Sequence, residues 1–285
     1  MWIAKDWNDY ELLGCGNGLR LERWGNRRIL RPDNNAKFPA WHGTDRLLYD
    51  GCYTSGKSGG HWECDSLPKR WSIQYRELLF EIGPTHFKQM GLFPEQAVNW
   101  DFAARQIKNA DRPIRVLNLF AYTGGATLAC AMAGAEVCHV DASKRMVALA
   151  KENALKSGLE NTPIRWIVDD CLKFVEREIR RGRKYDALIM DPPAYGHGPN
   201  GEVWNIQKNL LPFIERTASL LSNSPLFVLV NTYTEKLTSI NLAAMLRVAL
   251  QEKFGGIVSV QELGLPVSDT NFILPCGMTG RWFID

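Results

Sequence analysis

The stretch from Arg115 to Cys130, RVLNLFAYTGGATLAC, constrains the fold of this chain more than any other segment. Near its start, Val116, Leu117, Leu119 and Phe120 form a short apolar run, of the kind that is buried on both faces of a parallel sheet. The pair Gly124-Gly125 then interrupts the run, and small residues typical of a helix follow. The stretch therefore predicts a strand, a tight glycine turn and a helix, and open α/β sheets bind ligands at such a turn.

The ligand expected at this turn contains a ribose but no pyrophosphate. The two glycines allow the backbone to come close to a ligand. A dinucleotide normally requires a G-x-G-x-x-G run at the helix N-terminus, whereas this stretch has a single glycine pair. Sixteen residues after Gly125, a second apolar segment ends in Asp141, whose carboxylate can accept hydrogen bonds from two ribose hydroxyls. This combination indicates S-adenosylmethionine.

Four motifs in order resemble those of class I S-adenosylmethionine-dependent methyltransferases. They are Asn118-Leu-Phe-Ala-Tyr-Thr-Gly-Gly125, Val140-Asp141, Asp169-Asp170 and Asp191-Pro192-Pro193. The chain is most similar to the branch that contains the large-subunit ribosomal RNA cytosine-C5 methyltransferases, in which two-part enzymes carry a segment like Gly91-Leu-Phe-Pro-Glu-Gln96. The resemblance implies an α/β fold: a doubly wound, mostly parallel, seven-stranded Rossmann-like sheet behind a small N-terminal β domain.

The resemblance also implies which residues bind the cofactor. Asp141 would hold the ribose, Asp170 the adenine amine and the Cys171 N–H a ring nitrogen, while Gln96 would help to hold the methionine end. Either Asp169 or Asp170 can equally cap the helix that begins at Cys171, and both roles can coexist. The expected cofactor-binding residues are Gln96, Asn118, Phe120, Ala121, Tyr122, Thr123, Gly124, Gly125, Asp141, Ala142, Ser143, Asp170, Cys171 and Asp191. No metal is expected.

The expected catalytic residues are Asp191, Pro192, Pro193 and Tyr195. Two consecutive prolines stiffen the loop and remove two N–H donors, so that it presents acceptors to the cofactor ammonium and to a planar base. Tyr195 could stack on that base or could be an ordinary surface residue. His197, in the same glycine-rich loop, could remove a proton or could have no role.

One departure from the family pattern concerns the nucleophile. Methylation of cytosine C5 requires a cysteine that first adds to C6, and in the resembling enzymes this cysteine follows the fifth strand. Here the predicted fifth strand, 226–230, is followed by Asn231-Thr232-Tyr233-Thr234, and no cysteine lies between Cys171 and Cys276. The sequence therefore favours an amine or another intrinsically nucleophilic acceptor.

The chain divides into a small β-rich domain at residues 1–84, a connecting helical segment at 85–110 and the methyltransferase domain at 111–285. A hairpin is expected from 19–24 and 27–31, joined by Gly25-Asn26. Its residues Arg20, Arg23, Arg27, Arg28 and Arg31, with Trp24 beside them, could form a basic face that docks on RNA. Alternating charges on a hairpin are also commonly just its solvated side.

Composition places few limits on function. The hydrophobic content of 45% and the net charge of +3 are those of an ordinary globular protein, and they permit a nucleic-acid partner without demanding one. Seven cysteines without a C-x-x-C pair read as reduced thiols, and the N-terminus has no signal-peptide pattern, so we expect a cytoplasmic protein. The spacing of His42, Cys52, His61 and Cys64 matches no standard zinc pattern. No membrane association is expected, and a homodimer is possible.

The expected function is S-adenosylmethionine-dependent methylation of RNA, with a ribosomal RNA base favoured. The alternatives are a methyltransferase for a small molecule or a protein, and a non-catalytic protein that binds S-adenosylmethionine and RNA in assembly. A nicotinamide-dependent dehydrogenase is a more distant alternative.

Overall fold

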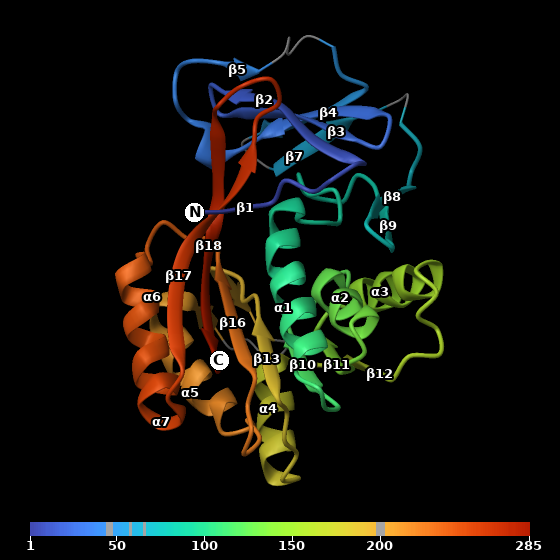
Figure 1. Ribbon diagram of the computed structural model, residues 1–285. Coiled ribbons are helices and arrows are strands. Elements are labelled where there is room, and N and C mark those ends of the chain that lie inside the picture. The colour runs from blue at the N-terminus through green and yellow to red at the C-terminus, as the bar shows by residue number, and fades with distance from the viewer. Residues whose placement is uncertain (44–47, 57–58, 65–66, 198–202) are drawn as a thin grey trace. The chain divides into compact units, whose positions relative to one another are not determined.

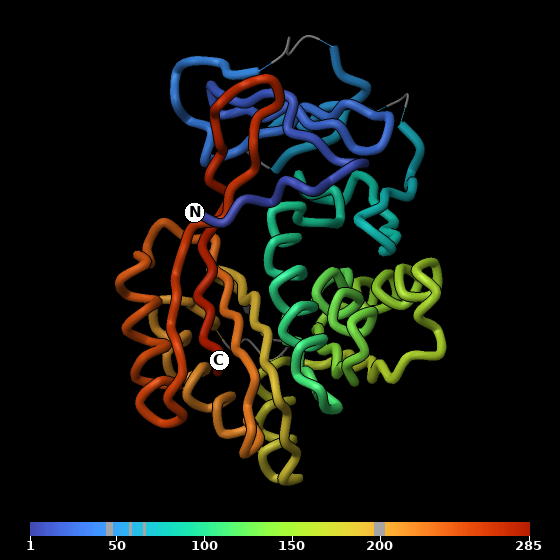
Figure 2. Tube along the Cα trace, in the orientation of Figure 1, coloured from blue at the N-terminus to red at the C-terminus, as the bar shows by residue number. Residues whose placement is uncertain are grey.

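The computed structural model describes residues 1–43, 48–56, 59–64, 67–197 and 203–285 (Figure 1). Contacts divide the chain into a first unit, Met1–Val98 with Leu263–Cys276, and a second unit, Asn99–Glu262 with Gly277–Asp285. The chain, whose path is traced in Figure 2, therefore passes from one unit to the other more than once. The boundaries predicted at residues 84 and 110 divide the chain into continuous segments. The roles assigned to those domains stay predictions.

The predicted sheet lies mostly in the second unit. Its strands are β10 (Arg115–Leu119), β11 (Glu136–Asp141), β12 (Ile164–Val168), β13 (Ala187–Met190), β16 (Phe227–Thr232), β17 (Ile257–Pro266) and β18 (Ile273–Phe283). They lie in the order β17-β18-β16-β13-β10-β11-β12. The strands from β16 to β12 are parallel, and β18 is antiparallel to β16. The predicted fold class is confirmed, with β1 (Trp2–Ile3) added by pairing with Leu263 and Gly264 of β17.

Helices cover both faces of this sheet (Figure 1). One face carries α1 (Ala97–Asn109), α2 (Gly125–Met132) and α3 (Lys144–Lys156). The other carries α4 (Cys171–Arg180), α5 (Ile206–Ala218), α6 (Ser239–Leu246), the π-helical turn η3 (Arg247–Gln251) and α7 (Glu252–Phe254). Leu119, Val140 and Met190 of the strands share one core with helix residues such as Phe174 and Leu210, because alternate strand side chains point to the same face. No helix of the described residues is long and apolar enough to cross a membrane.

The first unit is β-rich, as predicted. One sheet has the order β5-β2-β3-β4-β6-β7, and β8 pairs with β9. The bounds are β2 (Tyr10–Gly16), β3 (Leu19–Trp24), β4 (Arg27–Pro32), β5 (His42–Gly43), β6 (Gly51–Gly56), β7 (Gly59–Glu63), β8 (Trp71–Tyr75) and β9 (Leu78–Ile82), with the 3-10 turns η1 (Asn34–Ala36) and η2 (Pro94–Gln96). The predicted hairpin is confirmed, because Trp24 pairs with Arg27 across Gly25-Asn26.

The arginines of this hairpin do not form the continuous basic face that was considered for RNA docking. Arg20 and Arg31 are buried, Trp24 is fully buried, and the interrupting Glu22 is fully buried as well. Arg23, which is partly exposed, forms an ion pair with Glu11. Half of the hairpin's charged residues therefore point into the unit rather than into solvent.

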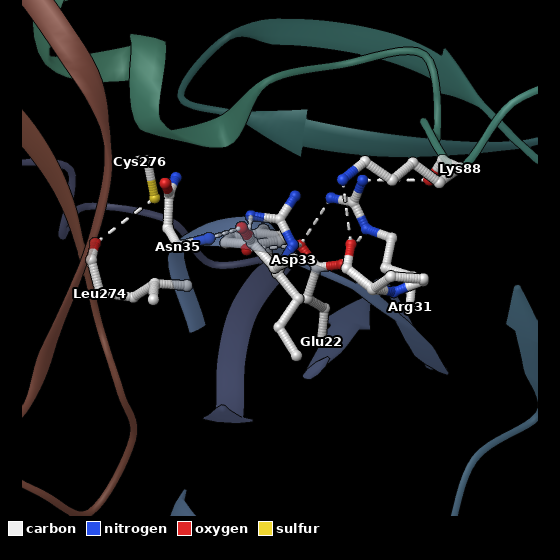
Figure 3. Close-up of polar contacts among 10 residues, drawn as sticks. Glu22, Arg31, Asp33, Asn35, Lys88, Leu274 and Cys276 are labelled. Atoms are coloured by element: carbon white, nitrogen blue, oxygen red, sulfur yellow. Dashed lines mark hydrogen bonds and ion pairs between the residues drawn. The ribbon is translucent and has the colours of Figure 1, made fainter. Parts of the chain in front are cut away.

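Glu22 is the centre of the buried charges (Figure 3). Its Oε1 accepts hydrogen bonds from Arg31 Nη2 at 2.9 Å and from the Tyr10 hydroxyl at 2.8 Å, and it lies 3.3 Å from Arg20 Nε. Arg20 also pairs with Asp33 at 3.1 Å. Burial by itself would raise the pKa of Glu22, but the two guanidinium groups outweigh it and lower that pKa to about 2.

A neutral polar chain lies behind the glycine turn of the second unit. The Asn118 amide donates to Thr127 Oγ1 at 2.9 Å, and Thr127 Oγ1 lies 2.9 Å from His139 Nδ1. Burial lowers the pKa of His139 to about 3, so the ring is neutral. The Thr127 hydroxyl accepts from Asn118, and the ring tautomer decides whether it donates to Nδ1 or accepts from it. The chain joins β10, α2 and β11.

Replacement of Glu22 by glutamine should lower the free energy of unfolding by about 3 to 5 kcal/mol, because two buried guanidinium groups would lose their shared carboxylate. The control is Asp6→Asn, which breaks an ion pair with Arg76 whose side chains are both 55% exposed. That change should cost less than about 1 kcal/mol. Urea denaturation of both variants measures the difference, and equal effects would contradict the structural role of Glu22.

Replacement of Thr127 by valine keeps the shape of the side chain but removes the hydroxyl that joins Asn118 to His139. The unfolding free energy should fall by about 1 to 3 kcal/mol, because two buried polar groups lose their partner. Thr217→Val is the matched control, since Thr217 is fully buried and its hydroxyl has no hydrogen-bond partner among the described residues. That variant should be as stable as the wild type or more stable.

His139 should make stability fall at mildly acidic pH. The pKa of His139 is about 3 in the folded protein and 6.5 in the unfolded chain. Between pH 6.5 and pH 3, therefore, only the unfolded chain takes up a proton at this residue. The contribution of neutral His139 to the free energy of unfolding is complete above pH 6.5 and is lost as the pH falls toward 3. Between pH 7.5 and 5.5 the wild type should lose about 1.4 kcal/mol more than His139→Gln. Equal losses in urea titrations at the two pH values would show that His139 does not remain neutral.

Candidate active site

The register of the parallel strands brings the predicted motif residues to one edge of the sheet. Leu119 pairs with Val140 and Met190, and these pair in turn with Ile167 and Val230. The residues that follow this row are Phe120, Asp141, Val168, Asp191 and Asn231. They lie at the carboxyl edge of the sheet, where doubly wound folds bind their ligands.

The loop after β10 has an unusual backbone. Phe120, Tyr122 and Gly124 have φ angles of +56°, +50° and +92°, and this region is unfavourable for the first two residues. Hydrogen bonds hold the loop: Ala121 N–H donates to the Val140 carbonyl at 3.1 Å, and the Asn153 side chain donates to the Thr123 carbonyl at 3.0 Å. Strain of this kind is concentrated at functional sites.

Asp141 is the main anchor of the loop. Its Oδ2 accepts from the Tyr122 N–H at 2.9 Å, and its Oδ1 accepts from the Ser143 N–H at 2.8 Å. Burial raises the pKa of Asp141, and these two hydrogen bonds oppose the rise. Ser143 also caps α3, because its side chain accepts from the Met146 N–H. Ala142 lies between Asp141 and Ser143.

The two glycines have a packing role that the sequence interpretation did not assign. A Cβ on Gly125 would lie 2.5 Å from Trp100 Cζ2, and one on Gly124 would lie 3.0 Å from the Ala150 Cβ. The second glycine is therefore needed for the close approach of α1, and the first for its left-handed φ and its contact with α3. The expected approach of the backbone to a ligand stays a prediction.

Asp170 caps α4, since its Oδ1 accepts from the Lys173 N–H at 2.9 Å. Asp169 is occupied by an ion pair with Arg177, and its Oδ1 accepts from the Asp170 N–H. The sulfur of Cys171 accepts from the Phe120 N–H at 3.3 Å, and burial raises the pKa of this thiol above its usual range. Because α4 begins at Cys171, the N–H of that residue has no acceptor within the helix.

Asp191 follows β13, and its N–H donates to the Leu119 carbonyl at 3.4 Å. A hairpin of β14 (Tyr195–His197) and β15 (Val203–Asn205) follows, where the sequence predicts only a loop. Trp204 Nε1 donates to the Pro193 carbonyl at 2.6 Å, and this bond ties the hairpin to Asp191-Pro192-Pro193. Pro192 is buried, whereas Tyr195 is 57% exposed and accessible to a partner. The side chain of His197 lies outside the described residues.

At the position expected for a catalytic cysteine, this chain has Asn231, whose side chain has a structural role. Asn231 Oδ1 accepts from the Thr279 hydroxyl at 2.6 Å and from the Asn99 side chain at 3.3 Å. Arg281 Nη2 donates to Asn99 Oδ1 at 2.8 Å, and its guanidinium lies 4.4 Å from the centre of the Phe102 ring. This network joins β16 to α1 and β18.

Sequence reasoning missed several residues that hold the site. Thr127, His139 and Asn153 lie behind the glycine turn, and Trp204 holds the proline loop. The available signal was a polar side chain inside an apolar helix or strand, which must find a partner when buried. Gln96 is buried and belongs to the first unit, so its expected role at the methionine end stays a prediction.

The residues at this edge are compatible with the nucleoside part of S-adenosylmethionine. Each oxygen of Asp141 accepts one backbone N–H, so lone pairs remain for two hydroxyl donors. The Cys171 N–H at the start of α4 suits an acceptor nitrogen of the adenine ring. The individual roles of these residues stay predictions.

Comparison with known proteins shows the family. The family profile described as S-adenosylmethionine-dependent methyltransferase matches residues 23–223. The crystal structure of a SAM-dependent methyltransferase from Agrobacterium tumefaciens is 35% identical, with a TM-score of 0.93 over 100% of this chain and 93% of that chain.

Ribosomal RNA large subunit methyltransferase K/L of Pseudoalteromonas atlantica is 31% identical over 144 residues, which are 50% of this chain and 19% of the relative. The protein of the same name from Shewanella frigidimarina is 30% identical over 145 residues, 50% of this chain and 20% of the relative. The chain thus spans about one fifth of the length of these relatives. The family profile and the similar crystal structure agree, and the chain belongs to the S-adenosylmethionine-dependent methyltransferases.

Proposed function

We propose that this protein transfers a methyl group from S-adenosylmethionine to a nitrogen of an RNA base, with ribosomal RNA as the favoured substrate. The names of the K/L relatives support an RNA target. The choice of a nitrogen acceptor rests on the residues at the carboxyl edge of the sheet. Asp191 follows β13 at this edge, Tyr195 is exposed, and Asn231 within β16 stands where the resembling enzymes carry a nucleophilic cysteine.

A nitrogen acceptor suits the chemistry of these side chains. The bound cofactor supplies a methyl group already activated on a sulfonium, so the protein must align the acceptor and exclude water. The Asp191 carboxylate can accept a hydrogen bond from an amino group and direct its lone pair toward the methyl group. When the new N–C bond forms and the methyl–sulfur bond of the cofactor breaks, the nitrogen would lose a proton to Asp191 or to solvent. Tyr195 would stack on the base.

Methylation at cytosine C5 has no support in this site. An amide such as Asn231 cannot add to C6 as a thiolate does, and its oxygen already accepts two hydrogen bonds. Burial raises the pKa of the Cys171 thiol, which therefore remains protonated and bonded to the Phe120 N–H. An intrinsically nucleophilic nitrogen needs neither group.

The proposal extends to the surroundings of the protein. All seven cysteines are free, as expected in a reducing compartment, and we place the protein in the cytoplasm. A homodimer is kept as a proposal that light scattering at several concentrations would test.

The deciding experiment is transfer of labelled methyl groups to RNA. Ribosomal and transfer RNA fractions from a strain that lacks the gene would be incubated with the protein, and the modified nucleoside would be identified by mass spectrometry. A methylated base nitrogen in RNA from the deletion strain, absent with wild-type RNA, is the expected product. Transfer only to a small molecule or a protein, or cofactor binding without any transfer, would support the alternatives.

Two aspartates should separate chemistry from cofactor binding. Asp191→Ala should lower kcat by about 100-fold or more and change the dissociation constant of the cofactor by less than about tenfold. Asp141→Ala should weaken cofactor binding by about 10- to 100-fold, because two charge-assisted hydrogen bonds and the loop anchor are lost. Calorimetry with S-adenosylhomocysteine and single-turnover transfer measure the two effects. The exposed Glu252→Gln on α7 is the control, and reversed outcomes for the two aspartates would refute the assignment.

A further inference from the structure

The side chain of Asn231 is held in place by its oxygen alone. Oδ1 accepts from the Thr279 hydroxyl at 2.6 Å and from the Asn99 side chain at 3.3 Å. The amide nitrogen of Asn231 has no hydrogen-bond partner among the described residues. The side chain is only 3% exposed, yet this nitrogen is not one of the fully buried polar atoms that lack a partner, so it touches solvent. Asn231 therefore offers an unused NH₂ group.

Arg281 sets the orientation of this amide through two intervening side chains. A guanidinium can only donate, and Arg281 donates to Asn99 Oδ1 from Nε at 3.2 Å and from Nη2 at 2.8 Å. Asn99 must therefore turn its NH₂ group toward Thr279 Oγ1, at 2.8 Å, and toward Asn231. If the Asn231 amide were rotated by half a turn, its NH₂ group would meet that of Asn99. The hydrogen bonds thus run in one direction and end at the Asn231 oxygen.

The order of the strands places the unused NH₂ group on the side of Asp191. β16 lies between β18, which carries Thr279, and β13, which leads into Asp191. Thr279 is the Cα partner of Asn231, so the oxygen is bonded on the β18 side and the nitrogen points away from β18. Met190 pairs with Val230, and the next residues, Asp191 and Asn231, lie on the same face of the sheet.

An acceptor and a donor therefore stand next to each other at the carboxyl edge. The Asp191 carboxylate accepts, and the Asn231 NH₂ group donates. The complementary edge of a base has an amino group beside an unprotonated ring nitrogen, as adenine has in N6 and N1 and cytosine in N4 and N3. Guanine and uracil place a ring N–H on this edge. Two donors would then face each other, and both would remain without a hydrogen bond.

We propose that Asn231 selects the target base by donating to the unprotonated ring nitrogen next to the amino group that Asp191 accepts. The methylated base is then an adenine or a cytosine, and the methylated atom is its exocyclic nitrogen. This nitrogen gains the methyl group as the methyl–sulfur bond of the cofactor breaks, and it releases one proton to Asp191 or to solvent. The ring nitrogen keeps its protonation state. The inference rests on the proposed methylation of RNA and adds the identity of the base.

The first test observes the Asn231 amide directly and needs no methyl transfer. Protein labelled with nitrogen-15 is saturated with S-adenosylhomocysteine, and the Asn231 side-chain signal is assigned by its absence from the spectrum of Asn231→Asp. Millimolar AMP or CMP should shift this signal, whereas GMP and UMP should not. The control is the side-chain amide of Gln251 on η3, which donates to the Gly256 carbonyl and should not shift with any nucleotide.

The second test uses altered bases in the RNA that accepts the labelled methyl group. 1-Deazaadenosine and 3-deazacytidine keep the amino group but have C–H in place of the ring nitrogen. They should lower kcat/KM of the wild type about 10- to 100-fold, because the Asn231 donor loses its acceptor. 7-Deazaadenosine is the matched control for adenine, since it leaves N1 in place, and it should react like adenosine.

Asn231→Asp removes the donor but keeps an oxygen for Thr279 and Asn99. With the natural base, kcat/KM of this variant should fall by about the same 10- to 100-fold. The deaza base should cause no further fall, because the hydrogen bond is already lost. Thermal melting and the affinity for S-adenosylhomocysteine check that the variant is folded. If it is not folded, the deaza bases with the wild type decide.

The outcomes separate this inference from the proposed function. Methylation of a guanine or uracil nitrogen in RNA would overturn the role of Asn231, while the proposed function would stand. Equal rates with the deaza and natural bases, or no shift of the Asn231 signal with AMP or CMP, would overturn it as well. A shift with AMP or CMP, but not with GMP or UMP, and no transfer to any RNA would uphold the base recognition and overturn the proposed function.

Discussion

The carboxylate of Asp141 makes the two hydrogen bonds on which the candidate active site depends. By accepting from the Tyr122 and Ser143 N–H groups, it joins the strained loop after β10 to the first turn of α3. The loop residues keep their positive φ angles because the surrounding structure holds the backbone in this conformation. A neutral side chain could not accept both bonds with the same strength, so the ribose-binding carboxylate expected from the sequence is also the residue that shapes its own site.

Buried polar groups support the two units in different ways. In the first unit Glu22, Arg20 and Arg31 form a charged cluster, in which loss of one member leaves buried charge without compensation. Behind the glycine turn of the second unit, Asn118, Thr127 and His139 form a neutral chain that joins two strands and a helix. This chain carries no charge, whereas Asp141, Asp170 and Asp191 place carboxylates at the carboxyl edge.

Much of the site could be predicted because it consists of residues that directly follow parallel strands. Asp141 and Asp191 lie one step past the row of paired residues, and strand register alone brings them to one edge. The reason for Gly125 could not be predicted, since Trp100 is distant in sequence and meets it only in the folded chain. The same holds for the basic face of the hairpin, because alternation along a strand does not say which side faces the core, and here Arg20, Trp24 and Arg31 face inward.

The sequence by itself determined the order of strands and helices, the glycine turn and the absence of a cysteine after β16. These follow from local patterns of apolar residues and from residue identity, which need no knowledge of distant contacts. Only the tertiary structure decided that residues 263–276 group with the N-terminal part, that the β14–β15 hairpin holds the proline loop, and that Thr279 and Asn99 fix the orientation of the Asn231 amide. Each of these depends on side chains far apart in sequence, whose packing and hydrogen bonds form only when the chain has folded.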